Sequence, residues 1–168
     1  RTFLPVTNPY YRTAHGLGVL RRQGYLWTGD SGTAGKKTRL DAANEQTAVE
    51  TEVSYLRLGE LHVAGIPGEI YPELVYGRVQ DPAEAAADFP DAAVEPSVAE
   101  ILPGKRWLLL GLANDEIGYI LPRRQWDQNP PFAYGRNSAQ YGEVNSCGPD
   151  VAPLLMEALR QAVAQVKD

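Results

Sequence analysis

The sequence predicts a mixed α/β fold, in which helices pack on the faces of a mixed sheet. Residues 49–55 alternate apolar and polar side chains, which is the period of a half-buried strand. Residues 106–112 form a nearly continuous apolar run, which suits a strand covered on both faces. After Asp150, residues 151–166 carry apolar side chains at helical spacing. Together these segments predict strands that are covered by helices.

Length and charge limit the function classes. The 168 residues correspond to a single domain over residues 1–168. The chain has 16 Lys and Arg against 21 Asp and Glu, a net charge of −5, which argues against a general nucleic-acid binder. The longest uncharged apolar run, residues 107–114, is shorter than the about 20 residues that a membrane-spanning helix needs, so no transmembrane segment is expected. Because the chain starts at Arg1 without a signal-peptide pattern, we expect a processed product, a trimmed chain or a fragment.

Helix-start signals place further elements. Asn8-Pro9 is typical of an N-cap followed by Pro at the first helical position, and it predicts a helix to about Leu20. Asp81-Pro82 predicts a second helix over residues 83–88 in the same way. Residues 70–76 can start another short helix.

Turn residues delimit the remaining segments. Residues 58–61 predict a tight hairpin turn, with residues 61–66 as the returning strand. We expect a long exposed loop over residues 29–46, irregular chain over residues 90–103, and a surface loop over residues 123–141.

Two apolar strands run directly into polar residues, and these places are candidates for a functional site. Pro67-Gly68 ends one strand and places Glu69 just beyond it, while residues 107–112 lead toward Tyr119. Ligands bind outside strand ends in sheets flanked by helices, so both segments could contribute to one site. A Glu can bind a metal, and a Tyr can act as a ligand or a hydrogen-bond donor. The alternative is that Glu69 is simply solvated and Tyr119 half-buried.

Two other side chains with reactive potential are assigned structural roles. His62 lies on a predicted strand, and a hydrogen-bonded structural histidine is the favoured interpretation. Cys147 has no adjacent Lys or Arg that would stabilise a thiolate, and as the single cysteine it cannot form an internal disulfide.

Five segments together carry a resemblance to a known family. They are AGIPGEIYPEL (64–74), GLANDEIGYILP (111–122), TEVSYLRLGEL (51–61), NPYYRTAHGLGVL (8–20) and QYGEVNSCGPDVAPLLMEAL (140–159). In their order along the chain, these segments resemble the catalytic domain of the neutral/alkaline non-lysosomal ceramidase family, in its bacterial relatives. The resemblance implies that residues 1–168 are a ceramidase-like α/β region, the C-terminal portion of a larger catalytic domain.

The resemblance also implies a chemistry. Ceramidases of this family are zinc amidases that cleave the N-acyl bond of ceramide, with Zn²⁺ held by two histidines, the Glu of Pro-Gly-Glu and a Tyr. Carried over, Glu69 and Tyr119 would be zinc ligands, and Tyr141 would help to hold the substrate carbonyl oxygen. Zn²⁺ lowers the pKa of a bound water to about 7 and polarises the carbonyl, so that an amide can be attacked at neutral pH.

The sequence also departs from the family pattern. His15 and His62 are its only histidines, and neither matches a family zinc ligand. The matching histidines are therefore expected upstream of Arg1. Residues 129–136 look like an insertion, and Gly142 stands where the family more often has Glu directly after Tyr.

Three functional hypotheses follow. The first is that the chain contributes part of the zinc site of a ceramidase-like amidohydrolase, which acts on an amide-containing, lipid-like substrate. The chain alone would be inactive without the N-terminal part of its domain. The second is a non-catalytic binding or structural module. The third is one half of a nicked enzyme, which predicts an exposed apolar face in isolation. The resemblance implies a secreted, periplasmic or cell-surface location.

Overall fold

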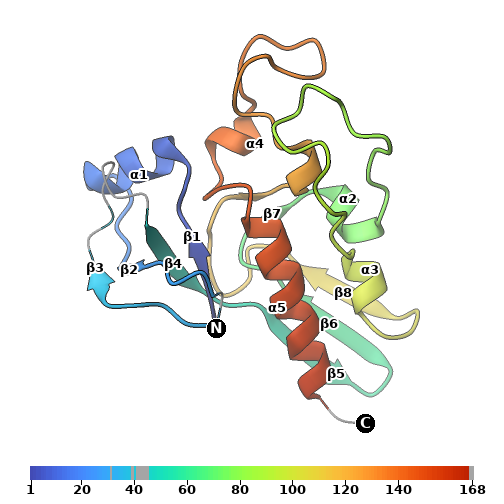
Figure 1. Ribbon diagram of the computed structural model, residues 1–168. Coiled ribbons are helices and arrows are strands. Elements are labelled where there is room, and N and C mark those ends of the chain that lie inside the picture. Colours follow the sequence, from blue (N-terminus) through green and yellow to red (C-terminus); the bar gives the residue numbers. More distant parts are fainter. Residues whose placement is uncertain (31, 39, 41–45, 167–168) are drawn as a thin grey trace.

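The computed structural model describes residues 1–30, 32–38, 40 and 46–166 (Figure 1). Its strands form three small sheets, and helices lie beside and between them. The strands are β1 (Thr2–Pro5), β2 (Gly24–Leu26), β3 (Lys37–Thr38), β4 (Thr47–Thr51), β5 (Ser54–Leu58), β6 (Leu61–Gly65), β7 (Glu69–Ile70), β8 (Trp107–Leu110) and β9 (Tyr119–Ile120). The helices are α1 (Pro9–Gly16), α2 (Pro72–Tyr76), α3 (Val98–Ile101), the 3₁₀ turn η1 (Arg123–Gln125), α4 (Tyr141–Val144) and α5 (Val151–Gln165).

The first sheet has the strand order β1-β4-β2-β3 and is antiparallel throughout. The sequence predicts one strand over residues 49–55, and this is wrong, because the chain leaves the first sheet after Thr51. That residue pairs with Thr2, where β1 begins, so the β1–β4 ladder ends there. The alternation of apolar and polar residues continues to residue 55 because β5, a strand of the second sheet, begins at Ser54.

The first sheet also corrects the expected loop over residues 29–46. Lys37 and Thr38 form β3 and pair with β2, and Leu40 is buried. Residues 31, 39 and 41–45 of that expected loop lie outside the described residues.

The second sheet, in the order β5-β6-β8, contains both strand orientations. β5 and β6 form the expected hairpin, in which Leu58 pairs with Leu61. Gly59 has a φ of +61°, as the first residue of a two-residue hairpin turn often requires. β8 lies parallel to β6. The mixed α/β class predicted from the sequence is therefore confirmed, although three small sheets replace the single sheet expected.

One face of the second sheet belongs to the core. The registers place Tyr55, Ala64, Trp107 and Leu109 on this face, and all four pack in the main apolar cluster. Helix α5 lies over the same sheet and contributes buried apolar side chains, as its predicted stripe requires (Figure 1). Burying this stripe against the strands is what fixes α5 in place.

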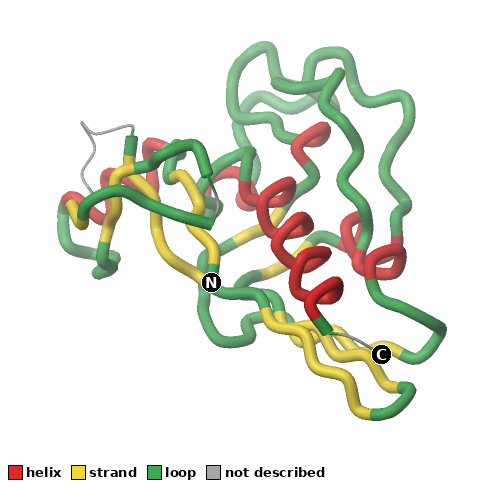
Figure 2. The backbone as a smooth tube through the Cα atoms, turned by 60° about the horizontal axis from the view of Figure 1, so that its bottom comes forward, coloured by secondary structure: helices red, strands yellow, loops and turns green. Residues whose placement is uncertain are grey.

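The opposite face of the second sheet is apolar and open. It carries five leucines between 36% and 58% exposed, here called the leucine face: Leu56, Leu58, Leu61, Leu108 and Leu110. Figure 2 shows helices on the other side of these strands and no described helix over this side. The prediction that residues 106–112 are covered on both faces is therefore wrong.

Helix predictions have mixed outcomes. α1 begins as predicted, with the side chain of Asn8 accepting a hydrogen bond from the N–H of Tyr10, but the helix ends at Gly16 rather than near Leu20. The predicted helix over residues 83–88 is wrong, since these residues form turns. So short a segment is marginal as a helix without an apolar face to bury. The carboxylate of Asp88 instead accepts backbone hydrogen bonds from the loop that follows η1.

Helix α3 interrupts the stretch that was expected to be irregular. Its capping box joins Ser97 and Glu100, each side chain accepting a hydrogen bond from the other residue's N–H. The Ser-x-x-Glu spacing is a recognised start signal, so the sequence did contain the information for this helix.

The leucine face makes a testable prediction. The isolated chain should enhance the fluorescence of a dye that binds exposed apolar surface, because five clustered leucines offer a continuous patch. The double variant L56K/L108K should lower that signal strongly. L17K is the matched control, because Leu17 is 76% exposed but lies outside the leucine face. Equal dye binding by all three proteins would contradict the existence of the patch.

Candidate functional site

The candidate site lies just beyond the ends of two parallel strands. β6 ends at Gly65 and β8 at Leu110, and each chain then runs on into a short strand of the third sheet. These short strands, β7 and β9, pair in parallel, with Glu69 opposite Tyr119. Paired residues share a face of the sheet, so the two side chains predicted from separate motifs lie side by side.

The next residues along β7 and β9 turn inward. Ile70 lies opposite Ile120, which is fully buried, and both pack in the main apolar cluster. Because side chains alternate along a strand, this inward pair forces Glu69 and Tyr119 toward solvent. The carboxylate of Glu69 is accordingly exposed.

Two glycines make this pairing possible. A Cβ on Gly68 would overlap the carbonyl oxygen of Gly118, and a Cβ on Gly118 would overlap the carbonyl oxygen of Asn145. Gly118 also has a φ of +86°, in the region that side chains disfavour. Both positions therefore require glycine, and this explains the glycines beside Glu69 and Tyr119 in the two motifs.

A strained turn holds the two strands in place. Leu112 and Asn114, between β8 and β9, have φ values of 53° and 68°, which are unusual for residues other than glycine. The backbone N–H of Ala113 donates to the carbonyl of Ile66 at 2.9 Å, and that of Ile117 donates to the carbonyl of Pro67 at 2.8 Å. The turn and the Pro-Gly bend thus fix each other's position.

Glu69 and Tyr119 interact directly. A hydrogen bond to the Glu69 carboxylate raises the pKa of the Tyr119 hydroxyl above its ordinary value, with burial and the negative charge of Glu69 adding to the effect. The Glu69 carboxylate and the Tyr119 hydroxyl therefore lie close enough to interact. Two oxygens placed side by side in this way could hold a cation between them.

Tyr141 completes an aromatic group around Tyr119. It is the first residue of α4 and is 72% exposed, and its ring meets the Tyr119 ring edge-on at a centroid distance of 5.5 Å. All three residues predicted from the sequence thus come together. The functional roles assigned to them stay predictions.

Tyr71 is a neighbour that sequence reasoning missed. Its ring lies 6.3 Å from that of Tyr119, again edge-on. A Cβ on Gly142 would overlap the Tyr71 hydroxyl, so glycine after Tyr141 lets α4 approach this ring. The signal was available, because Tyr71 follows Glu69 by two residues and so has the same strand parity.

Asn8 anchors the segment that carries Tyr141. Its side-chain amide donates to the carbonyl oxygens of Glu143 at 2.6 Å and Ser146 at 2.7 Å, while its carbonyl oxygen caps α1. The backbone N–H of Tyr119 donates to the carbonyl of Asn145 at 2.8 Å. The end of α4 is therefore tied both to the N-terminal helix and to β9.

The two histidines form their hydrogen bonds with residues other than Glu69 and Tyr119. His15, on α1, makes a 3.0 Å hydrogen bond through Nδ1 with the carbonyl of Leu20. His62, on β6, makes a 2.6 Å hydrogen bond through Nδ1 with the Tyr55 hydroxyl, as expected of a structural histidine. Within the described ranges, no three His, Cys, Asp or Glu side chains gather closely enough to hold a metal ion.

The donor set therefore fits zinc only in part. Glu69 and Tyr119 are acceptable oxygen ligands, but zinc in proteins takes three or four protein ligands. Neither His15 nor His62 makes up the difference. On the described residues alone, these two oxygens do not make up a complete set of zinc ligands.

Cys147 is excluded as a nucleophile. Its side chain is buried, and burial raises the pKa of the thiol to about 12, so the thiolate is essentially absent at neutral pH. The Sγ atom lies 3.6 Å from the carbonyl oxygen of Ile117, as a weak donor in the core.

Comparisons with protein-family models, curated proteins and solved structures found no significant match to this chain. None of the helices in the described segments has the length and apolar character needed to cross a membrane.

The close approach at Gly118 predicts that alanine there costs more stability than alanine at Gly59. G118A should lower the free energy of unfolding by about 1–3 kcal/mol more than G59A does, because the new methyl group must displace neighbouring atoms. Gly59 is the matched control: its φ is also positive, so alanine incurs the cost of that backbone conformation, but it has open space around it. Urea denaturation of both variants measures the difference. Equal losses would contradict the close approach.

The interaction between Glu69 and Tyr119 predicts a titration shift. In E69Q the pKa of Tyr119 should fall toward the ordinary value of about 10, because the substitution removes the negative charge that disfavours tyrosinate. NMR titration of tyrosines labelled at Cζ, with Tyr119 assigned through Y119F, measures it. E60Q is the control, since Glu60 lies in the distant hairpin turn. An unchanged Tyr119 midpoint in E69Q would contradict the interaction.

Proposed function

We propose that this chain contributes Glu69 and Tyr119 to the zinc site of a ceramidase-like amidohydrolase, which cleaves the N-acyl bond of a lipid-like substrate. The observation that carries the proposal is the β7–β9 register, which sets the Glu69 and Tyr119 side chains next to each other on one face of the sheet. The pair comes from two motifs of the family resemblance, and Tyr141, from a third, lies against it.

In this proposal, Glu69 and Tyr119 would bind the metal ion and Tyr141 would bind the substrate. A divalent cation bound by the two oxygens would displace the hydroxyl proton of Tyr119, because its charge would favour the tyrosinate form. Bound zinc supplies a water of lowered pKa and polarises a carbonyl. Tyr141 lies at the surface beside Tyr119, where its hydroxyl could donate a hydrogen bond to the oxygen of a substrate amide.

The remaining zinc ligands must come from elsewhere, because the described residues bring no three His, Cys, Asp or Glu side chains together, and so the two histidines do not both join Glu69. We infer that another polypeptide segment, carrying two imidazole ligands, packs on the leucine face. The apolar surface there needs a covering partner, and it lies on the strands β6 and β8 that lead to the site. A single partner would then both cover the leucine face and complete the metal site.

A second candidate function is a non-catalytic binding module. The observation that favours it is that no group of three His, Cys, Asp or Glu side chains able to hold a metal ion occurs in the part of the chain that the structure describes. In that case, the exposed aromatic group of Tyr71, Tyr119 and Tyr141 would form a contact surface rather than a reaction centre.

Zinc binding and hydrolysis test the proposal. The 168-residue chain alone should bind zinc weakly and hydrolyse no fluorescent N-acyl substrate. Both E69Q and Y119F should weaken its residual zinc binding by about tenfold or more, because each removes one of two ligands. Y76F is the matched control, a tyrosine exposed elsewhere. Isothermal titration calorimetry measures the binding.

The protein purified from its source, with any bound partner retained, should contain zinc and hydrolyse the amide. Tight stoichiometric zinc in the isolated chain would contradict the shared site. Zinc binding that ignores both substitutions would contradict the ligand assignment, and a zinc-free, inactive source protein would favour the binding module.

A further inference from the structure

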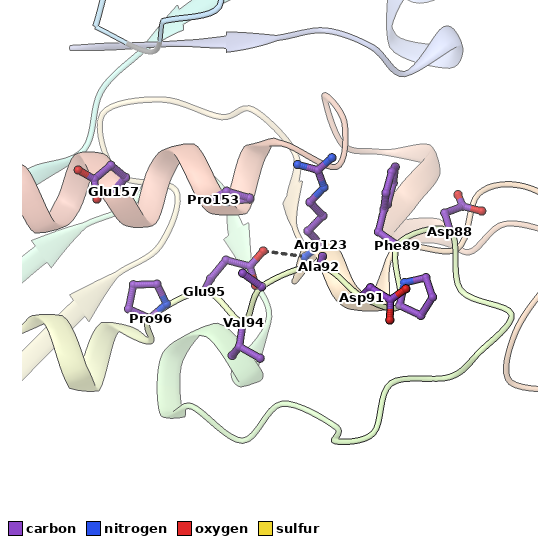
Figure 3. Close-up of a pocket in the computed structure, with 12 residues that line it drawn as sticks. Asp88, Phe89, Asp91, Ala92, Val94, Glu95, Pro96, Arg123, Pro153 and Glu157 are labelled. Carbon is purple, nitrogen blue, oxygen red and sulfur yellow. Dashed lines mark hydrogen bonds between the residues drawn. The ribbon is translucent and has the colours of Figure 1, made fainter.

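A cavity of about 520 Å³ lies apart from the residues of the candidate site, between residues 88–96, Arg123 and the first half of α5 (Figure 3). Its volume falls within the range of small-molecule sites. The lining is largely apolar, with Phe89, Val94 and Pro153 among its members. Surfaces of this kind favour an apolar ligand with one or a few polar groups.

The loop that forms this cavity is held by specific contacts. The carboxylate of Asp88 accepts the N–H of Gln128 at 2.9 Å, and Arg124 donates through Nε to the carbonyl of Ala92 at 3.0 Å. The N–H of Ala92 also donates to the carbonyl of Phe89 at 3.0 Å. These bonds preform the cavity, so that a ligand would not have to order the loop.

One carboxylate in the lining is buried and incompletely satisfied. Glu95 is 5% exposed, and its Oε1 accepts the N–H of Arg123 at 2.9 Å (Figure 3). Its Oε2 is buried and has no hydrogen-bond partner among the described residues. Leaving such an acceptor unpaired costs about 1–3 kcal/mol, which a suitable donor could recover. Burial also raises the pKa of Glu95.

The charges around the cavity favour a cation. Besides Glu95, the side chains of Asp88 and Asp91 line it, whereas the charge of Glu157, also in the lining, is paired with Arg160 at 2.7 Å. The single guanidinium in the lining belongs to Arg123. That guanidinium already pairs with Asp150 at 2.7 Å and lies over the Phe89 ring. The lining is therefore negative overall, and an anionic head group would be repelled.

We propose that this cavity binds an amphiphilic primary amine, whose ammonium group pairs with the Glu95 carboxylate once a small side-chain shift uncovers Oε2, while its hydrocarbon chain lies against the Phe, Pro and Val side chains. An ammonium supplies three donors, and its bond to a carboxylate is charge-assisted. An alcohol of the same chain would gain only the apolar contacts and a neutral hydrogen bond. This site does not depend on the proposed zinc chemistry.

Octylamine, 1-octanol and octanoate are the probes that test the proposal. Octylamine should bind saturably to the chain, with NMR shifts concentrated in residues 88–96, at least tenfold more tightly than octanol, and octanoate should not bind. E95Q should weaken octylamine binding at least tenfold and leave octanol binding within twofold. Its amide oxygen can still accept the N–H of Arg123, so the loop should be retained. E60Q is the control and should bind octylamine like the wild type, because Glu60 is not among the residues that line the cavity.

Two further variants locate the bound amine in this cavity. V94W should abolish binding of both amine and alcohol by filling the cavity, and it serves if E95Q fails to fold, since Val94 is about half exposed. E69Q should bind octylamine like the wild type, which separates this site from the zinc proposal. The proposal is overturned if octylamine does not saturate, if octanoate binds as well as octylamine, or if neither E95Q nor V94W changes binding.

Discussion

The close backbone approach at Gly68 and Gly118 is the constraint on which the candidate site depends. It brings β7 beside β9, which sets Glu69 opposite Tyr119 and directs the following isoleucines into the core. Gly118 also meets Asn145, and so the end of α4, with Tyr141, is held against the same pair. The geometry of three functional candidates thus follows from two positions that lack a side chain.

The candidate site and the exposed leucine face share the strands β6 and β8. Strands β6 and β8 are covered by α5 on one face, whereas the leucine face is bare and the same strands end at the candidate site. Glu69 and Tyr141 are likewise exposed. A soluble protein rarely leaves so contiguous an apolar patch without a partner. A partner on this face would also exclude water near the site, which would strengthen its electrostatics.

Local signals in the sequence predict much of this structure, and nonlocal contacts account for the rest. The cap at Asn8, the hairpin turn at Gly59 and the stripe of α5 are encoded within a few residues, so they could be identified. The end of β4 depends on where β1 begins, and the exposure of Leu108 depends on what packs above it. Neither the end of β4 nor the exposure of Leu108 can be predicted from neighbouring residues in the sequence. The roles of Glu69, Tyr119 and Tyr141 rest on the family resemblance, which the structure leaves as a prediction.

The most direct test of the proposed zinc site asks whether Tyr119 gives up its proton to a metal. An ultraviolet difference spectrum at neutral pH should compare the protein purified from its source before and after zinc is removed. If Tyr119 is a ligand, a tyrosinate signal should disappear with the metal and be missing in Y119F. If the zinc-loaded protein shows no tyrosinate, or if Y119F shows the same signal, Tyr119 is not a zinc ligand and the central claim fails.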